Sequence, residues 1–310
     1  MKTSVFAEYQ LSRLMLGTVQ FGMPYGIANT KGQPAYEDVR AILAGACAGG
    51  VNCLDTAAAY GQSEELIGRA LAELSLADQV IVVTKIPAIP ADCVAHPEVT
   101  RFIRNSVTIS LSRLRMAALP ICLFHHENDN RHLDVLQALQ KEGLIRHIGV
   151  SCGSRPDTAL ALASGSAAEA LQVPANILDP RHIRSGAFAQ AHKRGVAVFI
   201  RSVYLQGLAL MPEHEIPAEL QAVIPIRRNL AELAAEAGMG MAELALRYML
   251  SQPGVTCIIT GVESLDQIRQ NIALFSKGPL DASLVAAVAR AVPELPEKVV
   301  SPTMWPKVAK

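Results

Sequence analysis

The sequence predicts a single α/β domain over residues 1–310, with the (β/α)8 architecture of a TIM barrel. Eight short apolar or β-branched runs recur along the chain, and the segments between them carry apolar residues three and four positions apart, the spacing of a helix face that packs on a core. Strands that alternate with helices pair in parallel through right-handed crossovers. Eight such units in about 300 residues therefore favour a closed barrel.

The eight predicted strands follow one another along the whole chain. In order they are LMLGTVQF (14–21), VNCLD (51–55), VIVVTK (80–85), ICLFH (121–125), IRHIGVS (145–151), EALQVP (169–174), VAVFIRS (196–202) and VTCIITG (255–261). The helical period is clearest at Val39, Ile42, Leu43 and Ala46 and at Leu133, Leu136 and Leu139. Gly50, Gly143 and Gly195 each follow a predicted helix just before a strand, which is the usual position of a C-terminal cap.

An open, doubly wound sheet is the main alternative to the barrel. A sheet of that kind in a chain of this length would more often carry a second domain. The segment LGTVQFG (16–22) also lacks the GxGxxG turn of dinucleotide-binding domains, and no suitably placed acid follows it. The barrel is therefore the better interpretation.

The composition indicates a small-molecule partner in a reducing compartment. Half of the residues are hydrophobic, 18% are charged, and Lys+Arg equals Asp+Glu at 28 each, so there is no polybasic footprint for nucleic acid or a membrane surface. The six cysteines form no CxxC pair. No signal peptide and no apolar stretch of membrane-spanning length is evident, so we expect a cytoplasmic protein.

Four polar residues lie at or just beyond the ends of three consecutive predicted strands. Asp55 and Tyr60 follow the second strand, Lys85 ends the third and His125 ends the fourth. Each has an ordinary explanation by itself, since an aspartate can cap a turn, a lysine can be solvated, and a tyrosine or histidine can belong to the core. Consecutive barrel strands end side by side, however, so the four are expected to converge.

Such a group could place a proton on an oxygen that is becoming negative. A free tyrosine titrates near pH 10, and a nearby ammonium would be expected to lower that pKa. Lys85 could supply the ammonium and Asp55 could orient it, while His125 could form a hydrogen bond with the substrate oxygen and share in proton handling.

Six segments carry a resemblance to a known family. They are LDTAAAYGQSEELIGRAL (54–71), VVTK (82–85), LFHH (123–126), GLIRHIGVS (143–151), LQVPANILD (171–179) and IITGVESLDQIRQN (258–271). With these segments the chain resembles, nearly end to end, the aldo-keto reductases, barrels that reduce carbonyl compounds with a nicotinamide cofactor and no metal. The resemblance implies that Asp55, Tyr60, Lys85 and His125 form the catalytic tetrad, with Tyr60 as general acid.

The resemblance also implies a set of cofactor-binding residues. They are Ser151, Cys152, Gln172, Arg201, Ser202, Leu205, Gly207, Gly261, Glu263, Ser264, Gln267 and Asn271. Ser151 and Gln172 match positions that bind the nicotinamide carboxamide, and Cys152 stands where an asparagine is usual. Arg201 stands where many members stack a tyrosine on the nicotinamide ring, and an arginine plane can stack too. The loop at 202–207 would follow the pyrophosphate, and the segment at 261–271 would contact the adenosine side.

Glu263 bears on which cofactor is used. Many relatives place a basic residue near the 2′-phosphate of NADP, and a carboxylate there would cost affinity while suiting the ribose hydroxyls of NAD. The resemblance favours NADP(H), and NAD(H) remains an alternative.

The substrate side is expected to include Phe21, Tyr25 and Trp305, the last of these in a C-terminal tail (about 293–310) that would lie near the active-site face. No metal site is expected, because His125 and His126 would point to opposite faces while they remain within a strand. After His125 the family usually has one residue and then Pro-Asp, whereas this chain has Glu-Asn, so the loop there is expected to differ.

Two other functions fit parts of the pattern. Lys85 could act as the nucleophile of a Schiff-base aldolase-type barrel, which trapping with borohydride would reveal. The barrel could also bind a cofactor as a redox-sensing or regulatory subunit. The natural substrate, the direction of the reaction and the choice between monomer and homo-oligomer are left open.

Overall fold

A closed barrel of eight parallel strands forms the centre of the protein, in a computed structural model that describes residues 1–25 and 32–305. The strands are β3 (Leu14–Gly17), β4 (Cys53–Asp55), β5 (Ile81–Ile86), β6 (Leu119–Phe124), β7 (Ile145–Ser151), β8 (Ala170–Pro174), β9 (Ala197–Arg201) and β10 (Val255–Gly261). Each pairs with the next, and β10 pairs with β3 to close the ring. The predicted fold class is confirmed, and every predicted run overlaps one strand of the barrel.

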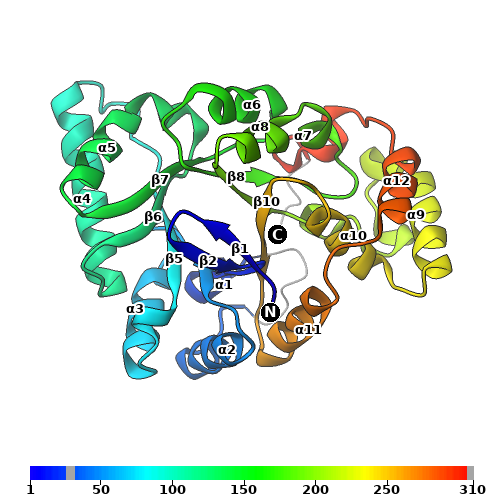
Figure 1. Cartoon of the computed structure of the whole chain (residues 1–310), viewed down its shortest axis with the longest axis horizontal. Coiled ribbons are helices and arrows are strands. Elements are labelled where there is room, and N and C mark those ends of the chain that lie inside the picture. Colours follow the sequence, from blue (N-terminus) through cyan, green and yellow to red (C-terminus); the bar gives the residue numbers. More distant parts are fainter. Residues whose placement is uncertain (26–31, 306–310) are drawn as a thin grey trace.

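The helices surround this barrel (Figure 1). They are α1 (Val19–Gly22), α2 (Tyr36–Ala48), α3 (Ser63–Glu73), α4 (His96–Leu114), α5 (Leu133–Lys141), α6 (Pro156–Gly165), α7 (Arg181–Arg184), α8 (Ala187–Lys193), α9 (Ile224–Glu236), α10 (Met241–Leu250), α11 (Leu265–Ser276), α12 (Ala282–Ala291) and α13 (Glu297–Val300). Short 3-10 turns are η1 (Ala77–Gln79), η2 (Glu127–His132), η3 (Leu205–Gly207), η4 (Glu213–Glu215), η5 (Ala218–Val223) and η6 (Pro302–Met304). Within the described ranges, no helix is long and apolar enough to cross a bilayer.

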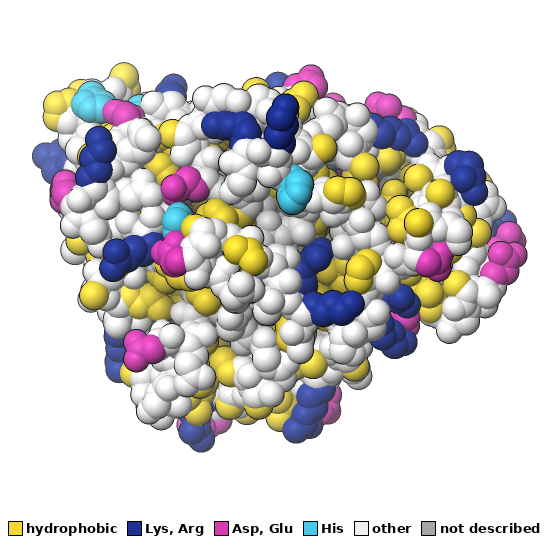
Figure 2. Space-filling model, viewed as in Figure 1, with side chains coloured by type: hydrophobic (Ala, Val, Ile, Leu, Met, Phe, Trp, Pro, Cys, Tyr) yellow, Lys and Arg dark blue, Asp and Glu magenta, His cyan; other side chains and the backbone are white. Residues whose placement is uncertain are grey.

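The surface and the helix ends agree with the sequence pattern. On the face in Figure 2, Lys and Arg side chains are scattered among acidic ones rather than gathered in one patch. Gly50, Gly143 and Gly195 have φ values of 80°, 80° and 71°, the left-handed conformation in which glycine ends a helix without strain.

The first predicted strand, 14–21, is wrong in its second half. β3 ends at Gly17, and the chain turns at Thr18, whose side chain donates to the Asp55 carbonyl at 2.8 Å. The following residues form α1 instead of continuing the strand. An apolar run of this length does not distinguish a buried strand from a short buried helix, so periodicity alone could not locate the break.

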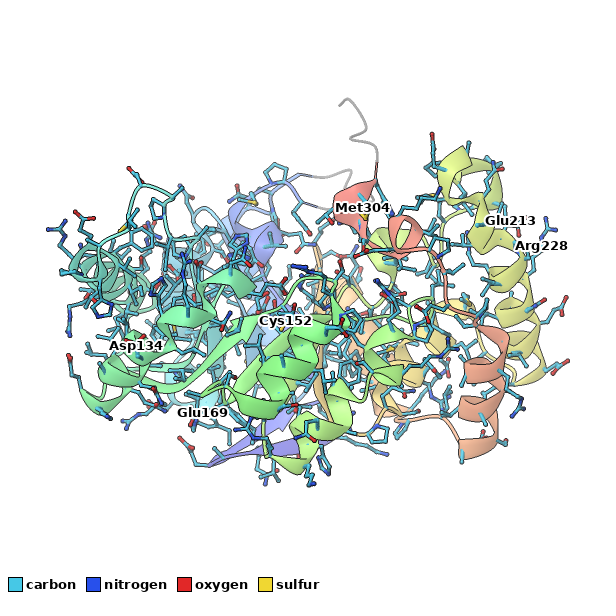
Figure 3. The ribbon with its side chains drawn as sticks, turned by 90° about the horizontal axis from the view of Figure 1, so that it is seen from above. Asp134, Cys152, Glu169, Glu213, Arg228 and Met304 are labelled. Carbon is cyan, nitrogen blue, oxygen red and sulfur yellow. The ribbon has the colours of Figure 1, made fainter. Side chains whose placement is uncertain are left out.

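A β-hairpin that the sequence analysis did not identify closes one end of the barrel. It pairs β1 (Thr3–Phe6) with β2 (Tyr9–Ser12), and Phe6 packs edge-on against Phe199 inside the barrel at 6.5 Å between ring centroids. Figure 3 places the hairpin at the bottom of the molecule and Met304 at the opposite end. The carboxyl ends of the strands are therefore left to form the site.

Strand alternation determines which residues face the barrel axis. Cys53 and Val83 belong to the cluster that fills the interior, while Leu54 and Val82 pack outward against the helices. Because side chains alternate along a strand, the inward position after Cys53 is Asp55 and the one after Val83 is Lys85. Apolar side chains thus fill the barrel up to the carboxyl ends of the strands, where polar side chains begin.

His182 of α7 is a buried base outside these layers. It is fully buried and stacks on Phe188, and among the residues described neither of its ring nitrogens has a hydrogen-bond partner. Burial lowers its pKa to about 4. His182 is therefore neutral in the folded protein at neutral pH.

This histidine is expected to make the protein lose stability in mild acid. An unfolded histidine titrates near pH 6.5, so between about pH 6.5 and pH 4 the unfolded chain binds a proton that the folded chain does not. From pH 7 to pH 5 this costs about 2 kcal/mol of unfolding free energy. Denaturant titrations at both pH values should show a loss smaller by that amount in His182→Phe. The exposed neighbour variant His192→Gln should lose as much as the wild type, and an equal loss in His182→Phe would contradict the assignment.

Candidate functional site

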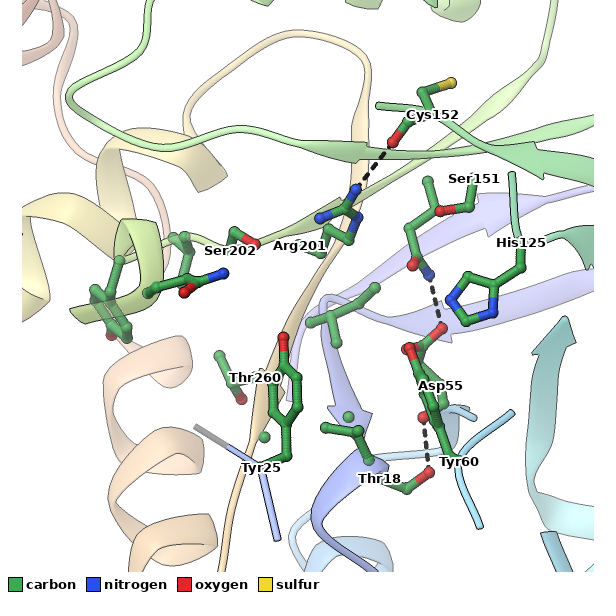
Figure 4. A pocket seen from close by; sticks show the side chains of 18 of the residues that line it. Thr18, Tyr25, Asp55, Tyr60, His125, Ser151, Cys152, Arg201, Ser202 and Thr260 are labelled. Atoms are coloured by element: carbon green, nitrogen blue, oxygen red, sulfur yellow. Dashed lines mark hydrogen bonds between the residues drawn. The ribbon is translucent and has the colours of Figure 1, made fainter. Parts of the chain in front are cut away.

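A cavity of about 720 Å³ opens at the carboxyl ends of the barrel strands (Figure 4). Strand-end residues from around the ring line it, namely Gly17, Asp55, Ser151, Gln172, Arg201 and Gly261. The loops that follow the strands supply the remaining walls. The sequence analysis predicted the site at this end of the barrel.

Asp55 and Lys85 form a buried ion pair at the floor of this cavity. The Lys85 Nζ donates to Asp55 Oδ1 at 2.6 Å and to the carbonyl of Thr56 at 2.8 Å, and the two charged side chains are 0% and 6% exposed. Gln172 Nε2 donates to the same Asp55 oxygen at 2.6 Å. Lys85 does not itself line the cavity, whereas Asp55 does.

This burial bears on the Schiff-base alternative. A nucleophilic lysine must present its amine to a substrate carbonyl. Here the amine lies beneath Asp55 and donates to two protein oxygens. Burial lowers the pKa of Lys85, and the Asp55 carboxylate acts in the opposite direction. The geometry therefore suits a fixed charge rather than a nucleophile.

A second buried carboxylate, Glu64 of α3, lies behind Lys85. It is 1% exposed, accepts a hydrogen bond from Thr84 at 2.6 Å, and pairs with Arg113 at 3.4 Å between nitrogen and oxygen. Its charge also helps to keep Lys85 protonated. The sequence analysis missed it, because a glutamate in the first turn of a helix usually faces solvent.

Tyr60 and His125 stand together above the ion pair. Their rings meet edge to face at 5.6 Å between centroids, and Lys85 Nζ lies 5.0 Å from the Tyr60 ring centroid. Both residues line the cavity. The structure therefore brings the four predicted residues into one group.

Two glycines allow Tyr60 to take this position. Gly61 has φ +52°, and a Cβ there would lie 2.2 Å from the carbonyl oxygen of Gly22. A Cβ on Gly22 would lie 1.7 Å from the carbonyl oxygen of Tyr60. The end of α1 and the turn that carries Tyr60 are thus in direct backbone contact.

The protonation of Tyr60 differs from the sequence-based prediction. Burial and the Asp55 carboxylate raise the pKa of Tyr60 above that of a free phenol, and Arg201 acts in the opposite direction. The prediction that Lys85 would lower this pKa is wrong for this structure, because Lys85 is paired with Asp55 and burial outweighs the nearby charges. Tyr60 is therefore a protonated donor at neutral pH.

His125 is neutral in this setting. Burial lowers its pKa to about 3, and the charges of Lys85, His126 and Arg201 add to that effect. β6 ends at Phe124, so His125 and His126 both line the cavity, with 5.5 Å between their ring centroids. In the described part of the chain, no group of three or more His, Cys, Asp or Glu side chains could hold a metal ion.

The predicted cofactor residues separate into two groups. Those that line the cavity are Ser151, Cys152, Gln172, Arg201, Ser202, Gly207, Gly261 and Asn271. Leu205, Glu263, Ser264 and Gln267 do not. Leu205 is buried in the core, and the Ser264 hydroxyl accepts from the Gln267 amide as the N-cap of α11, while the Gln267 side chain accepts from the Glu263 amide at 2.6 Å. The Ser264 and Gln267 side chains therefore bond to backbone amides at the start of α11.

The predicted substrate residues are also divided. Tyr25 lines the cavity, but Phe21 is fully buried on the inner side of α1, so its predicted place in the substrate wall is wrong. Trp305 packs against the core, and its indole donates to the Val299 carbonyl at 3.1 Å. From the C-terminal tail, Thr303 reaches the cavity, and residues 306–310 lie outside the described residues.

The loop after β9 brings backbone in unusual conformations to the cavity. Ser202, Leu205, Gln206 and Gly207 have φ values between 48° and 94°. Non-glycine residues rarely adopt this region, and such strain is held in place where the surrounding structure requires it. Ser202, Gln206 and Gly207 line the cavity, so the strained segment belongs to its wall.

Sequence reasoning missed Glu127 and Gly153 as part of the site. Glu127 Oε2 accepts a hydrogen bond from the Gly153 amide at 2.6 Å, and Arg201 Nη2 donates to the Cys152 carbonyl at 3.0 Å. All four residues line the cavity. The available signal was an acidic residue directly after the two histidines that follow β6.

Comparisons with known proteins point to one family. A family model described as "Aldo/keto reductase family" matches residues 13–292. The chain is 25% identical over 244 residues to "Uncharacterized oxidoreductase YqkF" of Bacillus subtilis (strain 168), covering 72% of this chain and 77% of the relative. It is 26% identical over 279 residues to the "NADH-specific methylglyoxal reductase" of Escherichia coli (strain K12), covering 78% of this chain and 85% of the relative.

Solved structures share the fold. The holo form of "aldo-keto reductase AKR11C1" from Bacillus halodurans superposes with a TM-score of 0.78 at 23% identity, covering 95% of this chain and 97% of that protein. Barrel, cavity and strand-end polar residues are thus found in a chain that matches one family over nearly its whole length.

Proposed function

The chain belongs to the aldo/keto reductase family and is an NAD(P)H-dependent oxidoreductase that reduces carbonyl compounds, and from this premise we propose which of its residues perform the reaction and which cofactor it prefers. The observation that carries the proposal is the placement of Tyr60 and His125 over the buried pair of Lys85 and Asp55, at the floor of one cavity.

The cavity wall has features that suit a nicotinamide cofactor. Gln20 lines the cavity, and its buried Oε1 has no hydrogen-bond partner among the described residues. A Cβ on Gly261 would lie 2.6 Å from the Gln20 amide, so glycine at this strand end allows the Gln20 side chain to pack directly against the backbone. Ser151, Gln172 and Asn271 add further polar groups to the cavity lining. These residues would hold the cofactor.

When bound, the reduced cofactor supplies a hydride to the carbonyl carbon and is oxidised to NAD(P)+. As the hydride adds to carbon, the electron pair of the C=O double bond moves to the oxygen, and Tyr60 donates its proton there to complete the alcohol. The raised pKa keeps Tyr60 protonated until that charge develops. Neutral His125 can donate a hydrogen bond to the same oxygen, and the Lys85 ammonium stabilises the resulting tyrosinate, which solvent reprotonates.

We propose that the substrate is a small polar aldehyde, ketone or sugar. His126, Glu127 and Asn128 line the cavity beside His125, so the wall next to the reacting group is polar. One relative is named for reduction of methylglyoxal, a small dicarbonyl compound. We expect kcat/KM to be higher for short dicarbonyls and hydroxylated aldehydes than for apolar aldehydes of similar size, and a screen of matched pairs would test this class.

We propose that Glu263 sets the preference between the two cofactors. It stands immediately before Ser264, the N-cap of α11, and a helix N-terminus is a position that favours phosphate. A carboxylate at this place opposes the 2′-phosphate of NADPH, and one relative is NADH-specific by name. The preference proposed here is for NADH, which differs from the NADP(H) preference that the resemblance implied.

Glu263→Lys is therefore expected to raise the affinity for NADPH relative to NADH by about tenfold, about 1.4 kcal/mol. Titration of the purified protein with each cofactor, followed by fluorescence and by the rise in melting temperature, measures both dissociation constants. Glu232→Lys on α9 reverses the same charge away from the cavity and should leave the ratio unchanged. An unchanged ratio in Glu263→Lys would separate this residue from the 2′-phosphate site.

We also propose that the C-terminal segment helps to cover the cavity. Thr303 lines the cavity, and the Ser301 hydroxyl donates to the Ser154 hydroxyl at 2.9 Å, which ties the segment to the loop after β7.

The six free cysteines support a reducing, cytoplasmic location.

A further inference from the structure

Arg201 is a permanent positive charge held inside the cavity. It ends β9 and points inward, and its Nη2 donates to the Cys152 carbonyl at 3.0 Å (Figure 4). A guanidinium stays protonated at any physiological pH. The cavity therefore contains a cation whose position is fixed by the backbone of the neighbouring loop.

The peptide unit that Arg201 contacts is also held by a second hydrogen bond. The Cys152 carbonyl and the Gly153 amide belong to the same peptide unit, and that amide donates to Glu127 Oε2 at 2.6 Å. One peptide unit thus lies between a guanidinium at its oxygen and a carboxylate at its N–H. A Cβ on Gly153 would lie 3.1 Å from the Glu127 carboxylate, so a glycine suits this close approach.

Arg201 also lies close to the reacting group. Tyr60, His125 and Arg201 line one cavity. Besides the larger effect of burial, the Arg201 charge acts on the pKa of both Tyr60 and His125. Tyr60 must reach the carbonyl oxygen whose carbon receives the hydride, so the nicotinamide ring must approach the same carbonyl. The ring and the guanidinium therefore share this end of the cavity.

The two redox states of the ring differ in charge. The reduced nicotinamide is neutral and the oxidised nicotinamide is a cation, so a fixed cation nearby repels only the oxidised form. We propose that Arg201 makes the site bind reduced cofactor in preference to oxidised cofactor, and that Glu127 limits this preference by placing a negative charge across the Cys152–Gly153 peptide. This inference rests on the proposed function, since it requires a nicotinamide cofactor in the cavity.

The consequence for turnover is release of the oxidised product. A site that holds NAD(P)+ weakly exchanges it readily for NAD(P)H after each reduction. Arg201 then promotes release of the oxidised cofactor. This role is separate from proton donation by Tyr60 and from the selection between NADH and NADPH by Glu263.

The test compares the dissociation constants of NADH and NAD+ in a set of matched variants. Arg201→Gln should lower the ratio of the NAD+ constant to the NADH constant by about tenfold. Arg201→Lys keeps the charge and should keep most of the ratio. Glu127→Gln keeps an acceptor for the Gly153 amide while it removes the charge, and it should raise the ratio. Arg290→Gln, an exposed change on α12, should have no effect.

The opposite signs expected for Arg201→Gln and Glu127→Gln distinguish electrostatics from a structural role, because damage to the loop would change both constants in the same way in each variant. A ratio that is equal in wild type and Arg201→Gln, or that falls in Glu127→Gln, would overturn the inference and leave the proposed function standing. Failure of the wild type to bind either NADH or NADPH would overturn both.

Discussion

Replacing Tyr60 with phenylalanine is expected to lower kcat for carbonyl reduction by roughly 10²- to 10⁴-fold, the range that a general acid contributes. The change removes only the hydroxyl, so the ring keeps its edge-to-face contact with His125 and its place over Lys85. Cofactor affinity should therefore change little. Steady-state rates with a small aldehyde, measured beside a cofactor titration, separate the loss of the proton from any loss of binding.

Tyr204→Phe is the matched control for this experiment. Tyr204 also lines the cavity, and burial raises its pKa to about 12, but it lies on the loop after β9 rather than over the buried ion pair. We expect it to retain most of the activity. If Tyr60→Phe turned over at the wild-type rate, the proton would have to come from another donor.

Asp55→Asn is expected to destabilise the folded protein by about 3–5 kcal/mol, because it leaves the Lys85 ammonium buried without its counter-charge. Gln172 would also lose its charged acceptor, since its amide donates to the same oxygen. Denaturant unfolding gives the free energy directly. Activity should fall as well, since Lys85 would be free to deprotonate or to move.

A double-mutant cycle shows whether the loss comes from the pair. Lys85→Met removes the buried charge and keeps a chain of similar length. The double variant Asp55→Asn/Lys85→Met is expected to be clearly more stable than the sum of the two single losses predicts. Additive losses would mean that each side chain contributes through its own packing and that the 2.6 Å contact adds little.

The strand-end residues could be predicted because they follow from a local rule. Strand alternation and barrel closure place Asp55 and Lys85 on neighbouring strands facing the same axis, and the same reasoning holds for Gln172 on β8. Neither statement needs the detailed path of a loop. Periodicity and strand order were therefore enough to place Asp55 and Lys85, whereas the position of Tyr60, which lies beyond β4, also depends on the backbone contact with Gly22.

The remaining features depend on contacts between distant segments. Whether Ser264 binds a ligand or caps its own helix is decided by the local turn, and here its hydroxyl accepts from an amide of α11. Phe21 would line the cavity only if β3 continued past Gly17, but the chain turns at Thr18. The pairing of Glu127 with Gly153 joins two loops 26 residues apart, and no period in the sequence relates them.

The backbone contact between Gly22 and Tyr60 has a consequence for engineering the enzyme. Libraries meant to broaden the substrate range usually vary positions near the cavity and treat small residues as free to change. Here neither Gly22 nor Gly61 lines the cavity, yet a single methyl group on either would displace the segment that carries the acid. Libraries for this scaffold should hold both glycines constant and vary His126 and Asn128 instead, which line the cavity beside His125.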